Sequence, residues 1–112
     1  MYLVGVVFAG VIAVLFMRGC EWDAGRPLSE QAGFSEHVEF VTGLRECGSI
    51  VEVGPLVDLS AVTDEDPVGL ALLDVDSVEA AASVLADDPM VRTGVLIARA
   101  RPWGGELLSR AG

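Results

Sequence analysis

The segment VIAVLFM, residues 11–17, decides the fold of this chain because both of its faces are apolar. In a β-strand, successive side chains point to opposite faces of the sheet. The alternation gives a set of four residues and a set of three: Val11, Ala13, Leu15 and Met17, then Ile12, Val14 and Phe16. A strand of this kind belongs inside a sheet that is covered on both sides. The segment VGLALLDV, residues 68–75, repeats the pattern, with Leu70 and Leu72 opposed by Ala71 and Leu73.

Between these two segments the sequence predicts a loop, a helix and another strand. Residues 19–32 (GCEWDAGRPLSEQA) mix glycine, proline and charged residues, which indicates a long loop. Apolar residues then recur at helical spacing, and a glycine suited to a left-handed cap follows: Phe34, Val38, Val41 and Leu44, then Gly48. This predicts a helix over residues 35–47. Residues 49–55 (SIVEVGP) are short, rich in β-branched residues and closed by proline, which predicts a strand.

The second half of the chain repeats this order of elements. Residues 56–67 are acidic and have no apolar period, so we expect a solvated connection before the strand at 68–75. Ser77 is suited to cap a helix, and Pro89 prevents that helix from continuing beyond Asp88. Its predicted inward stripe is Val78, Ala82 and Leu85. Residues 92–101 (RTGVLIARAR) predict the last strand, which Pro102 closes.

The resulting order, βαββαβ, predicts an α+β ferredoxin-like fold. Right-handed crossovers would place both helices on one face of a four-stranded antiparallel sheet. The other face would then be bare although it is apolar, and an exposed apolar face of this size costs several kcal/mol at roughly 25 cal/mol per Å². We therefore expect a homodimer in which two sheets pack face to face as a dimeric α/β barrel.

The chain has 112 residues, which is enough for one domain. We assign residues 11–103 to that domain, 1–10 to an apolar N-terminal extension and 104–112 to a C-terminal tail. The extension is read as a longer first strand or as residues upstream of a mis-assigned start codon. Residues 1–17 carry no charge, so a membrane anchor is the alternative. Gly5, Gly10 and the absence of a flanking basic cluster argue against an anchor. A secretory signal begins with basic residues, and this chain has none before Arg18, so we expect no signal peptide.

Composition excludes several classes of function. Seventeen acidic and seven basic residues give a formal net charge of −10, which disfavours binding to nucleic acid and to anionic membranes. Cys20 and Cys47 lie far apart and form no CxxC motif, so we expect reduced thiols and a cytoplasmic protein. With one histidine in the chain, we expect no metal site and no cofactor, although carboxylate-bound Mg²⁺ is not excluded. Nucleotide-binding and serine-hydrolase motifs are absent from the sequence.

His37 is the starting point for any acid/base chemistry, because it is the only histidine and its helical position is close to the apolar stripe. The simpler interpretation is a core or rim histidine that binds a backbone carbonyl. A catalytic imidazole needs a carboxylate to fix its tautomer, and three acids are candidates. Asp88 follows the second helix, where it could equally be a cap. Asp58 follows the turn at Gly54 and Pro55 and could be an ordinary loop acid. Glu52 shares a predicted strand face with Ile50, where an unpaired charge would be costly, unless it lies on an edge strand.

Two further features suggest contacts with a substrate. Arg99 and Arg101 share one face of the last strand and could bind a carboxylate in bidentate fashion, although solvent-facing edge positions are the favoured explanation. Trp22 lies in the long loop, where it could form part of a lid over a pocket or pack the loop onto the domain.

The pattern resembles the YCII-related (YciI-like) domain family over residues 11–103. The matching pieces are WDAGRPLSEQAGFSEH with His37, GSIVEVGPL, LLDVDS, DDPMVRTGV with Asp88, and RPW at 101–103. The resemblance implies a ferredoxin-like dimeric α/β barrel with a His–Asp pair in a cleft, formed here by His37 and Asp88. It also implies chemistry similar to that of small lyases or hydrolases that act on breakdown products of aromatic compounds.

Two hypotheses about function follow. In the first, His37 with Asp88, or with Asp58, moves a proton in the elimination or hydrolysis of a small organic acid, and Arg101 and Trp22 contact this substrate. In the second, the same cleft binds a small ligand, or the acidic surface binds a basic partner, without turnover.

Overall fold

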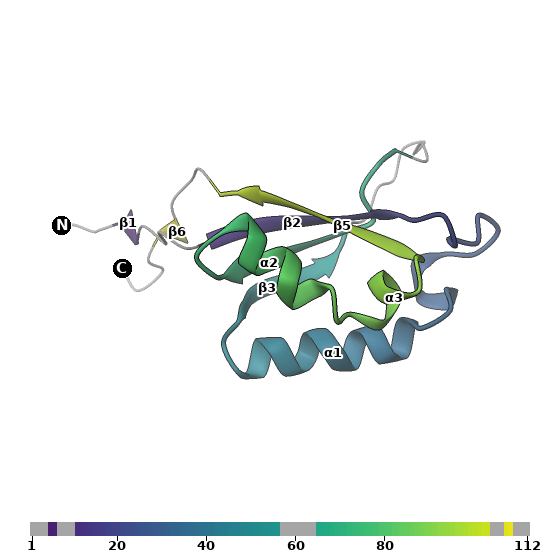
Figure 1. Ribbon diagram of the computed structural model, residues 1–112, viewed down its shortest axis with the longest axis horizontal. Coiled ribbons are helices and arrows are strands. Elements are labelled where there is room, and N and C mark those ends of the chain that lie inside the picture. The colour runs from purple at the N-terminus through teal and green to yellow at the C-terminus, as the bar shows by residue number, and fades with distance from the viewer. Residues whose placement is uncertain (1–4, 7–10, 57–64, 104–106, 109–112) are drawn as a thin grey trace.

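The computed structural model of the chain describes residues 5–6, 11–56, 65–103 and 107–108. Its main body is a four-stranded antiparallel sheet with all the helices on one face (Figure 1). The strands are β2 (Val11–Arg18), β3 (Ile50–Pro55), β4 (Gly69–Asp74) and β5 (Leu96–Pro102). The helices are η1 (Leu28–Glu30), α1 (Phe34–Glu46), α2 (Val78–Leu85) and the single turn α3 (Pro89–Arg92).

The spatial order of the strands is β3-β4-β2-β5, which matches the order of a ferredoxin-like sheet. β2 lies in the interior and pairs with β4 on one side and β5 on the other, as its two apolar faces predict. The predicted α+β class and the antiparallel sheet with helices on one face are therefore confirmed. The dimeric barrel concerns a second chain and stays a proposal.

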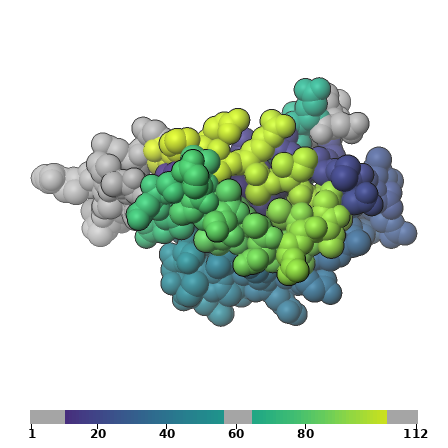
Figure 2. All heavy atoms as spheres, in the orientation of Figure 1, coloured from purple at the N-terminus to yellow at the C-terminus, as the bar shows by residue number. Residues whose placement is uncertain are grey.

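The core lies between the sheet and the helices. The three inner side chains of β2, namely Ile12, Val14 and Phe16, are buried, and Ala71 and Leu73 of β4 pack beside them. Helix residues close the core from the other side: Val41, Ala81, Leu85 and Met90. In the space-filling view, α2 and α3 lie between α1 and β5 and cover this face of the sheet (Figure 2).

Two details of the second half differ from the sequence prediction. In α2, Ala81 is buried and Ala82 is exposed, because both fit a helical period and only the crossing of α2 over the sheet selects one. The last strand begins at Leu96 rather than at Arg92, because Pro89–Arg92 form a helical turn whose side chain Met90 is fully buried.

A β-bulge in β3 corrects the predicted position of Glu52. The register shifts between Ile50, which pairs with Leu73, and Glu52, which pairs with Leu72. Glu52 therefore lies on the opposite face from Ile50, is exposed on an edge strand, and forms an ion pair with Arg45 at 3.4 Å. Gly48, with φ +88°, has the left-handed conformation that was predicted after the first helix.

The face of the sheet without helices is apolar at its centre and charged at its edges. Ala13, Leu15 and Met17 of β2 lie next to Leu70 and Leu72 of β4, and all five are half-buried in the single chain. The edge strand β5 adds Ile97, which is 45% exposed, and the exposed Arg99 and Arg101.

Two short strands outside the main sheet form a separate ladder. β1 (Gly5–Val6) pairs antiparallel with β6 (Leu107–Leu108), a pairing that the sequence did not indicate. Residues 11–17, part of the segment considered as an anchor, form strand β2. Within the described part of the chain, no helix has the length and apolarity that crossing a bilayer requires.

Candidate active site

Helix α1 directs His37 toward the sheet. The helix begins after Gly33, whose backbone has φ +85°, and the amide of His37 donates to the Gly33 carbonyl at 2.9 Å in the first turn. The side chain of His37 is only 9% exposed. Its ring meets the edge of Phe16 at a centroid distance of 5.5 Å and lies 6.2 Å from the ring of Phe34. These contacts leave the imidazole little freedom to rotate.

Asp88 is held at the junction of α2 and α3. Its backbone amide donates to the carbonyl of Leu85, the last residue of α2, at 3.0 Å. Its carboxylate Oδ1 accepts a hydrogen bond of 2.9 Å from the amide of Met90, so Asp88 is the N-cap of α3. Pro89 occupies the first helical position, where a missing N–H has no cost, and the side chain of Asp88 is fully buried.

The second carboxylate oxygen of Asp88 contacts His37. Asp88 Oδ2 lies 2.6 Å from His37 Nδ1, across 51 residues of sequence. The partner of the histidine is thus a carboxylate and not a backbone carbonyl. Both interpretations of Asp88 hold together, because one oxygen caps α3 and the other binds the imidazole. Within the described chain, no buried side-chain nitrogen or oxygen lacks a hydrogen-bond partner.

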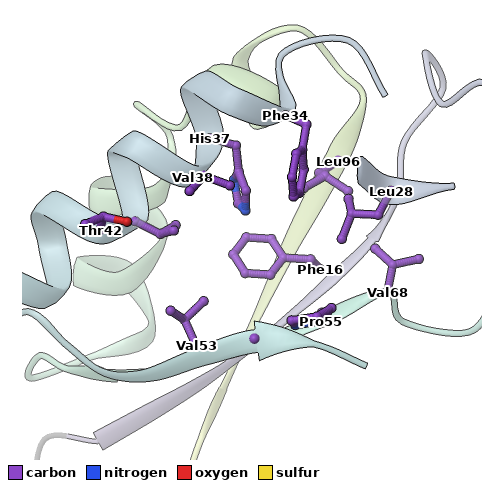
Figure 3. Close-up of a pocket in the computed structure, with 13 residues that line it drawn as sticks. Phe16, Leu28, Phe34, His37, Val38, Thr42, Val53, Pro55, Val68 and Leu96 are labelled. Carbon is purple, nitrogen blue, oxygen red and sulfur yellow. The ribbon is translucent and has the colours of Figure 1, made fainter. Parts of the chain in front are cut away.

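His37 lies in the wall of an apolar pocket of about 230 Å³ between α1 and the sheet (Figure 3). The aromatic and aliphatic lining residues are Phe16, Leu28, Phe34, Val38, Val41, Val53, Pro55, Val68 and Leu96. Among the described lining residues, His37 and Thr42 are the ones with polar side chains. Figure 3 shows the ring of His37 pointing from α1 into this space, above the ring of Phe16. A largely apolar pocket with one fixed imidazole is suited to a small, weakly polar ligand.

The other candidate residues do not gather around His37. Asp58 lies outside the described residues. Trp22 is half-buried against the core and lines a neighbouring cavity instead of this pocket. Arg101 lies on the face of the sheet without helices, opposite Ala13, and lines neither the pocket at His37 nor the cavity beside Trp22. Its position supports the edge interpretation and gives it no contact with the pocket in this chain.

Gln31 is a residue that the sequence reasoning missed. Its side chain is buried and its Nε2 donates to the carbonyls of Asp23 and Arg26, both at 2.7 Å. Its Oε1 accepts a hydrogen bond of 2.9 Å from the Asp23 amide. Three hydrogen bonds from one buried amide fix the loop that carries Leu28 into the wall of the pocket. The only signal in the sequence is a glutamine at the end of a loop, which is too common to interpret.

Within the described residues, no group of three His, Cys, Asp or Glu side chains could hold a metal ion. Of these four residue types, the described side chains at the pocket wall are His37 and, behind it, Asp88, and the two bind each other.

The fold and the pocket together define a class: a small α+β protein of ferredoxin-like topology with a buried His–Asp pair at an apolar pocket. A family model described as the YCII-related domain matches residues 14–103. The chain belongs to the YCII-related family, as the resemblance of its motifs predicted.

A search of solved structures gives a similar fold at low sequence identity. The structure is 5-chloro-2-hydroxyhydroquinone dehydrochlorinase from Burkholderia phenoliruptrix, in complex with 2,5-dihydroxybenzoquinone. It has a TM-score of 0.56 and 17% identity, and the match covers 83% of this chain and 92% of that chain. A likeness at this identity supports the fold alone. A search among curated proteins finds no match.

Proposed function

We propose that this YCII-related protein is a small-molecule lyase in which His37 transfers a proton and Asp88 positions the imidazole. The observation that carries this proposal is the 2.6 Å contact between His37 Nδ1 and Asp88 Oδ2 at the wall of an apolar pocket. A base held by a buried carboxylate beside a ligand-sized pocket is the arrangement that general acid/base catalysis needs.

The hydrogen bond to Asp88 decides which ring nitrogen acts as the base. A carboxylate accepts, so it favours the tautomer with the proton on Nδ1 and leaves the lone pair on Nε2. In an elimination, Nε2 takes a proton from the substrate. The electron pair of the broken bond forms the new double bond, and the leaving group departs with its own electron pair. The negative charge of Asp88 stabilises the imidazolium until it returns the proton to the leaving group or to water.

Hydrolysis is the second reaction that the pair could perform, and the lining of the pocket favours elimination over it. Hydrolysis of an acyl compound needs donors for an oxyanion and a held water molecule. The polar side chains among the described lining residues are His37 and the exposed Thr42. Elimination needs only a base close to the proton that leaves, which His37 supplies.

The size of the pocket limits the substrate. A cavity of about 150 Å³ lined by Leu, Ile and Phe holds one benzene ring. The pocket of about 230 Å³ therefore accommodates a single six-membered ring with small substituents. The similar structure described above is a dehydrochlorinase bound to a dihydroxybenzoquinone, which agrees with a ring-shaped ligand and a lyase.

We also propose that the protein forms a homodimer, which buries the face of the sheet that carries no helices. Leu15, Leu70 and Leu72 form the apolar centre of this face. Glu52 lies toward the β3 edge, and Arg101 lies on the β5 edge in the same row across the sheet. A two-fold axis parallel to the strands would place the β3 edge of one copy over the β5 edge of the other. Opposite charges would then meet at both rims, which makes the face complementary to itself. The pocket at His37 lies between α1 and the sheet, on the side of the sheet opposite to this proposed interface.

The test is a screen for turnover with hydroxylated and halogenated six-membered ring compounds, followed by variants. His37→Gln and Asp88→Asn are expected to lower kcat/KM about 10²- to 10⁴-fold, because each removes the base or its orientation. Glu39→Gln, an exposed change on the same helix, is the matched control and should retain activity. Full activity of His37→Gln on a turned-over substrate would contradict the mechanism.

Ligand binding without turnover is the competing function, and native mass spectrometry of the purified protein separates the two. A substrate that is converted to product in the presence of wild-type protein, and not of His37→Gln, supports the enzyme. A bound compound that is unchanged after days with the wild-type protein supports a binding protein instead.

A further inference from the structure

Gly69 forms part of the floor of the pocket at His37. It is the first residue of β4, it is buried, and it pairs in register with Phe16 of β2 on one side and with Pro55 of β3 on the other. Residues directly opposite each other in antiparallel strands point to the same face of the sheet. A side chain at position 69 would therefore lie on the inner face, in the same layer as the buried ring of Phe16.

Neither the backbone nor the packing of the protein explains a glycine at position 69. The described glycines with positive φ, a conformation that other residues rarely adopt, are Gly33, Gly48 and Gly94. Gly69 is not one of them. A Cβ added to Gly69 would lie 3.4 Å from Cδ2 of Phe16 and 3.4 Å from the carbonyl oxygen of Gly54, which are ordinary van der Waals contacts. An alanine would therefore fit at this position.

A glycine with strands on both sides has a cost for the fold. It has more conformational freedom in the unfolded chain than any other residue, and it has no side chain to pack. Where neither a turn nor a tight contact requires it, a strand glycine is typical of a place where a ligand comes close to the backbone. Gly69 lies at the wall of a ligand-sized pocket, which is such a place.

Gly54, the other glycine that lines this pocket, does not leave space in it. Its neighbours Val53 and Pro55 both line the pocket, and Figure 3 shows their side chains on the pocket side of β3. Because side chains alternate along a strand, a Cβ at Gly54 would lie on the opposite side of the sheet. Gly54 also pairs in register with Leu70, which lies on the face without helices. Of the two glycines, Gly69 is the one whose missing side chain enlarges the pocket.

The floor around Gly69 is held in place by backbone hydrogen bonds. The amide of Val68 donates to the carbonyl of Phe16 at 2.7 Å, and the carbonyl of Val68 accepts from the amide of Leu56 at 3.0 Å. The ring of Phe16, next to Gly69, meets the ring of His37 at a centroid distance of 5.5 Å. A ligand beside His37 can therefore place a small group over Gly69 within the same cavity.

We infer that Gly69 determines the specificity of the pocket: its missing side chain leaves room for one substituent, about the size of a methyl group, on a six-membered ring that lies beside His37. This inference rests on the proposed function for the ring itself, and it adds the substituent to the substrate class. The substrate is then a substituted ring, and its substituent lies against the backbone of β4.

The test compares the dissociation constant of phenol with those of ortho-, meta- and para-cresol, which each carry one added methyl group. NMR titration of the valine and leucine methyl signals measures them. In the wild-type protein, one cresol should bind about fourfold more tightly than phenol, which is the gain for one buried methyl group. In Gly69→Ala this gain should disappear, because the alanine Cβ occupies the space. Gly43→Ala, an exposed change on α1 outside the pocket lining, is the control and should keep the gain.

Stability measurements separate a role in the pocket from a role in folding. Gly69→Ala should raise the midpoint of urea denaturation, because alanine restricts the unfolded chain and its methyl group packs against Phe16. A Gly69→Ala protein that is less stable than wild type would show that the fold requires the glycine, and would overturn the inference. A variant that keeps the cresol gain, or a wild-type protein that binds no cresol more tightly than phenol, would overturn it as well.

The same titrations separate this inference from the proposed catalysis. His37→Gln should keep the cresol gain, because the methyl group lies over Gly69 and not against the imidazole. Loss of the inference by any of the results above would leave unchanged the turnover comparison between wild type and His37→Gln, on which the proposed function stands.

Discussion

Asp88 shows at the scale of one residue how a structural role and a proposed chemical role combine. Its Oδ1 caps α3 and its Oδ2 binds His37, so the short helix that the side chain caps also fixes the direction of the carboxylate. The sequence could identify the cap, because Asp before Pro is typical of a helix start. It could not identify the contact with His37, because that contact joins residues 51 positions apart.

The tautomer of His37 is the first prediction at this scale. In the wild-type protein, the neutral imidazole should carry its proton on Nδ1, because Asp88 Oδ2 only accepts. In Asp88→Asn, the amide keeps its oxygen for the cap and donates its N–H to Nδ1, so the proton should move to Nε2. Long-range ¹H–¹⁵N NMR measures the tautomer, and the chain has one histidine, so the signal is unambiguous. The same tautomer in both proteins would contradict the role given to Asp88.

The second prediction concerns the reactivity of the Cys47 thiol and its dependence on pH. The side chain of Ser49, with its Oγ 3.5 Å from the sulfur, lowers the pKa of the Cys47 thiol below its usual range. A lower pKa gives more thiolate at neutral pH, and the thiolate is the form that reacts. Ser49→Ala should therefore slow alkylation of Cys47 by iodoacetamide at about pH 7.5, where the thiolate fraction limits the rate.

The Cys47 experiment uses a Cys20→Ser background, so that one thiol reports the rate. The difference between the proteins should disappear at a pH well above both pKa values, where each thiol is fully ionised. Equal alkylation rates near neutral pH would show that Ser49 does not act on the thiol.

At the scale of elements, the junction between the end of β2 and the start of β5 depends on a close approach of two backbones. The Gly19 amide donates to the Val95 carbonyl at 2.9 Å, and a Cβ added to Gly19 would lie 2.1 Å from the Gly94 carbonyl oxygen. Such a contact is impossible without moving one strand relative to the other. The loop that follows Gly19 carries Trp22, so this junction also positions the cavity that Trp22 lines.

Replacing glycine by alanine at two positions should change the free energy of unfolding in opposite directions. Gly19→Ala should lower the free energy of unfolding by roughly 1–3 kcal/mol, because the backbone must shift. Gly43→Ala, in the interior of α1 with no atom within 4 Å of the added Cβ, should raise it by about 0.5–1 kcal/mol through helix propensity. Urea denaturation at one fixed protein concentration measures both, and a Gly19→Ala protein as stable as wild type would contradict the predicted clash.

At the scale of the whole molecule, the sheet has one face covered by helices and one that the described chain leaves uncovered. On the second face, Leu15 pairs in register with Leu70 on one side and with Arg99 on the other. The apolar centre with opposite charges at its edges is the basis for the proposed dimer.

The dimer is tested by charge placed at the centre of this face. The wild-type protein should sediment as a dimer, and Leu15→Glu should be monomeric, because an unpaired buried carboxylate costs several kcal/mol. Ala82→Glu, on the exposed side of α2, is the control and should remain dimeric. A wild-type protein that is monomeric at all accessible concentrations would exclude the dimer.

The sequence by itself determined the class of fold, because strand and helix periods are local and the two doubly apolar segments had to lie inside a sheet. It also determined that His37 faces the sheet, since α1 carries its apolar stripe next to that residue. Three predictions that depend on tertiary contacts were wrong. A bulge turns Glu52 away from the face of Ile50, Ala81 is buried in place of Ala82, and β5 begins at Leu96 rather than at Arg92.

Only the tertiary structure decided the site. Asp88 at His37 and Gln31 within the loop are each defined by contacts between segments apart in the sequence, which no local pattern encodes. Arg101, which the sequence placed near a substrate, lies on the other face because β5 alternates and its inward positions are Leu96, Ala98 and Ala100. Local periodicity specifies which face a residue occupies within its own element. The packing of the elements determines which faces meet.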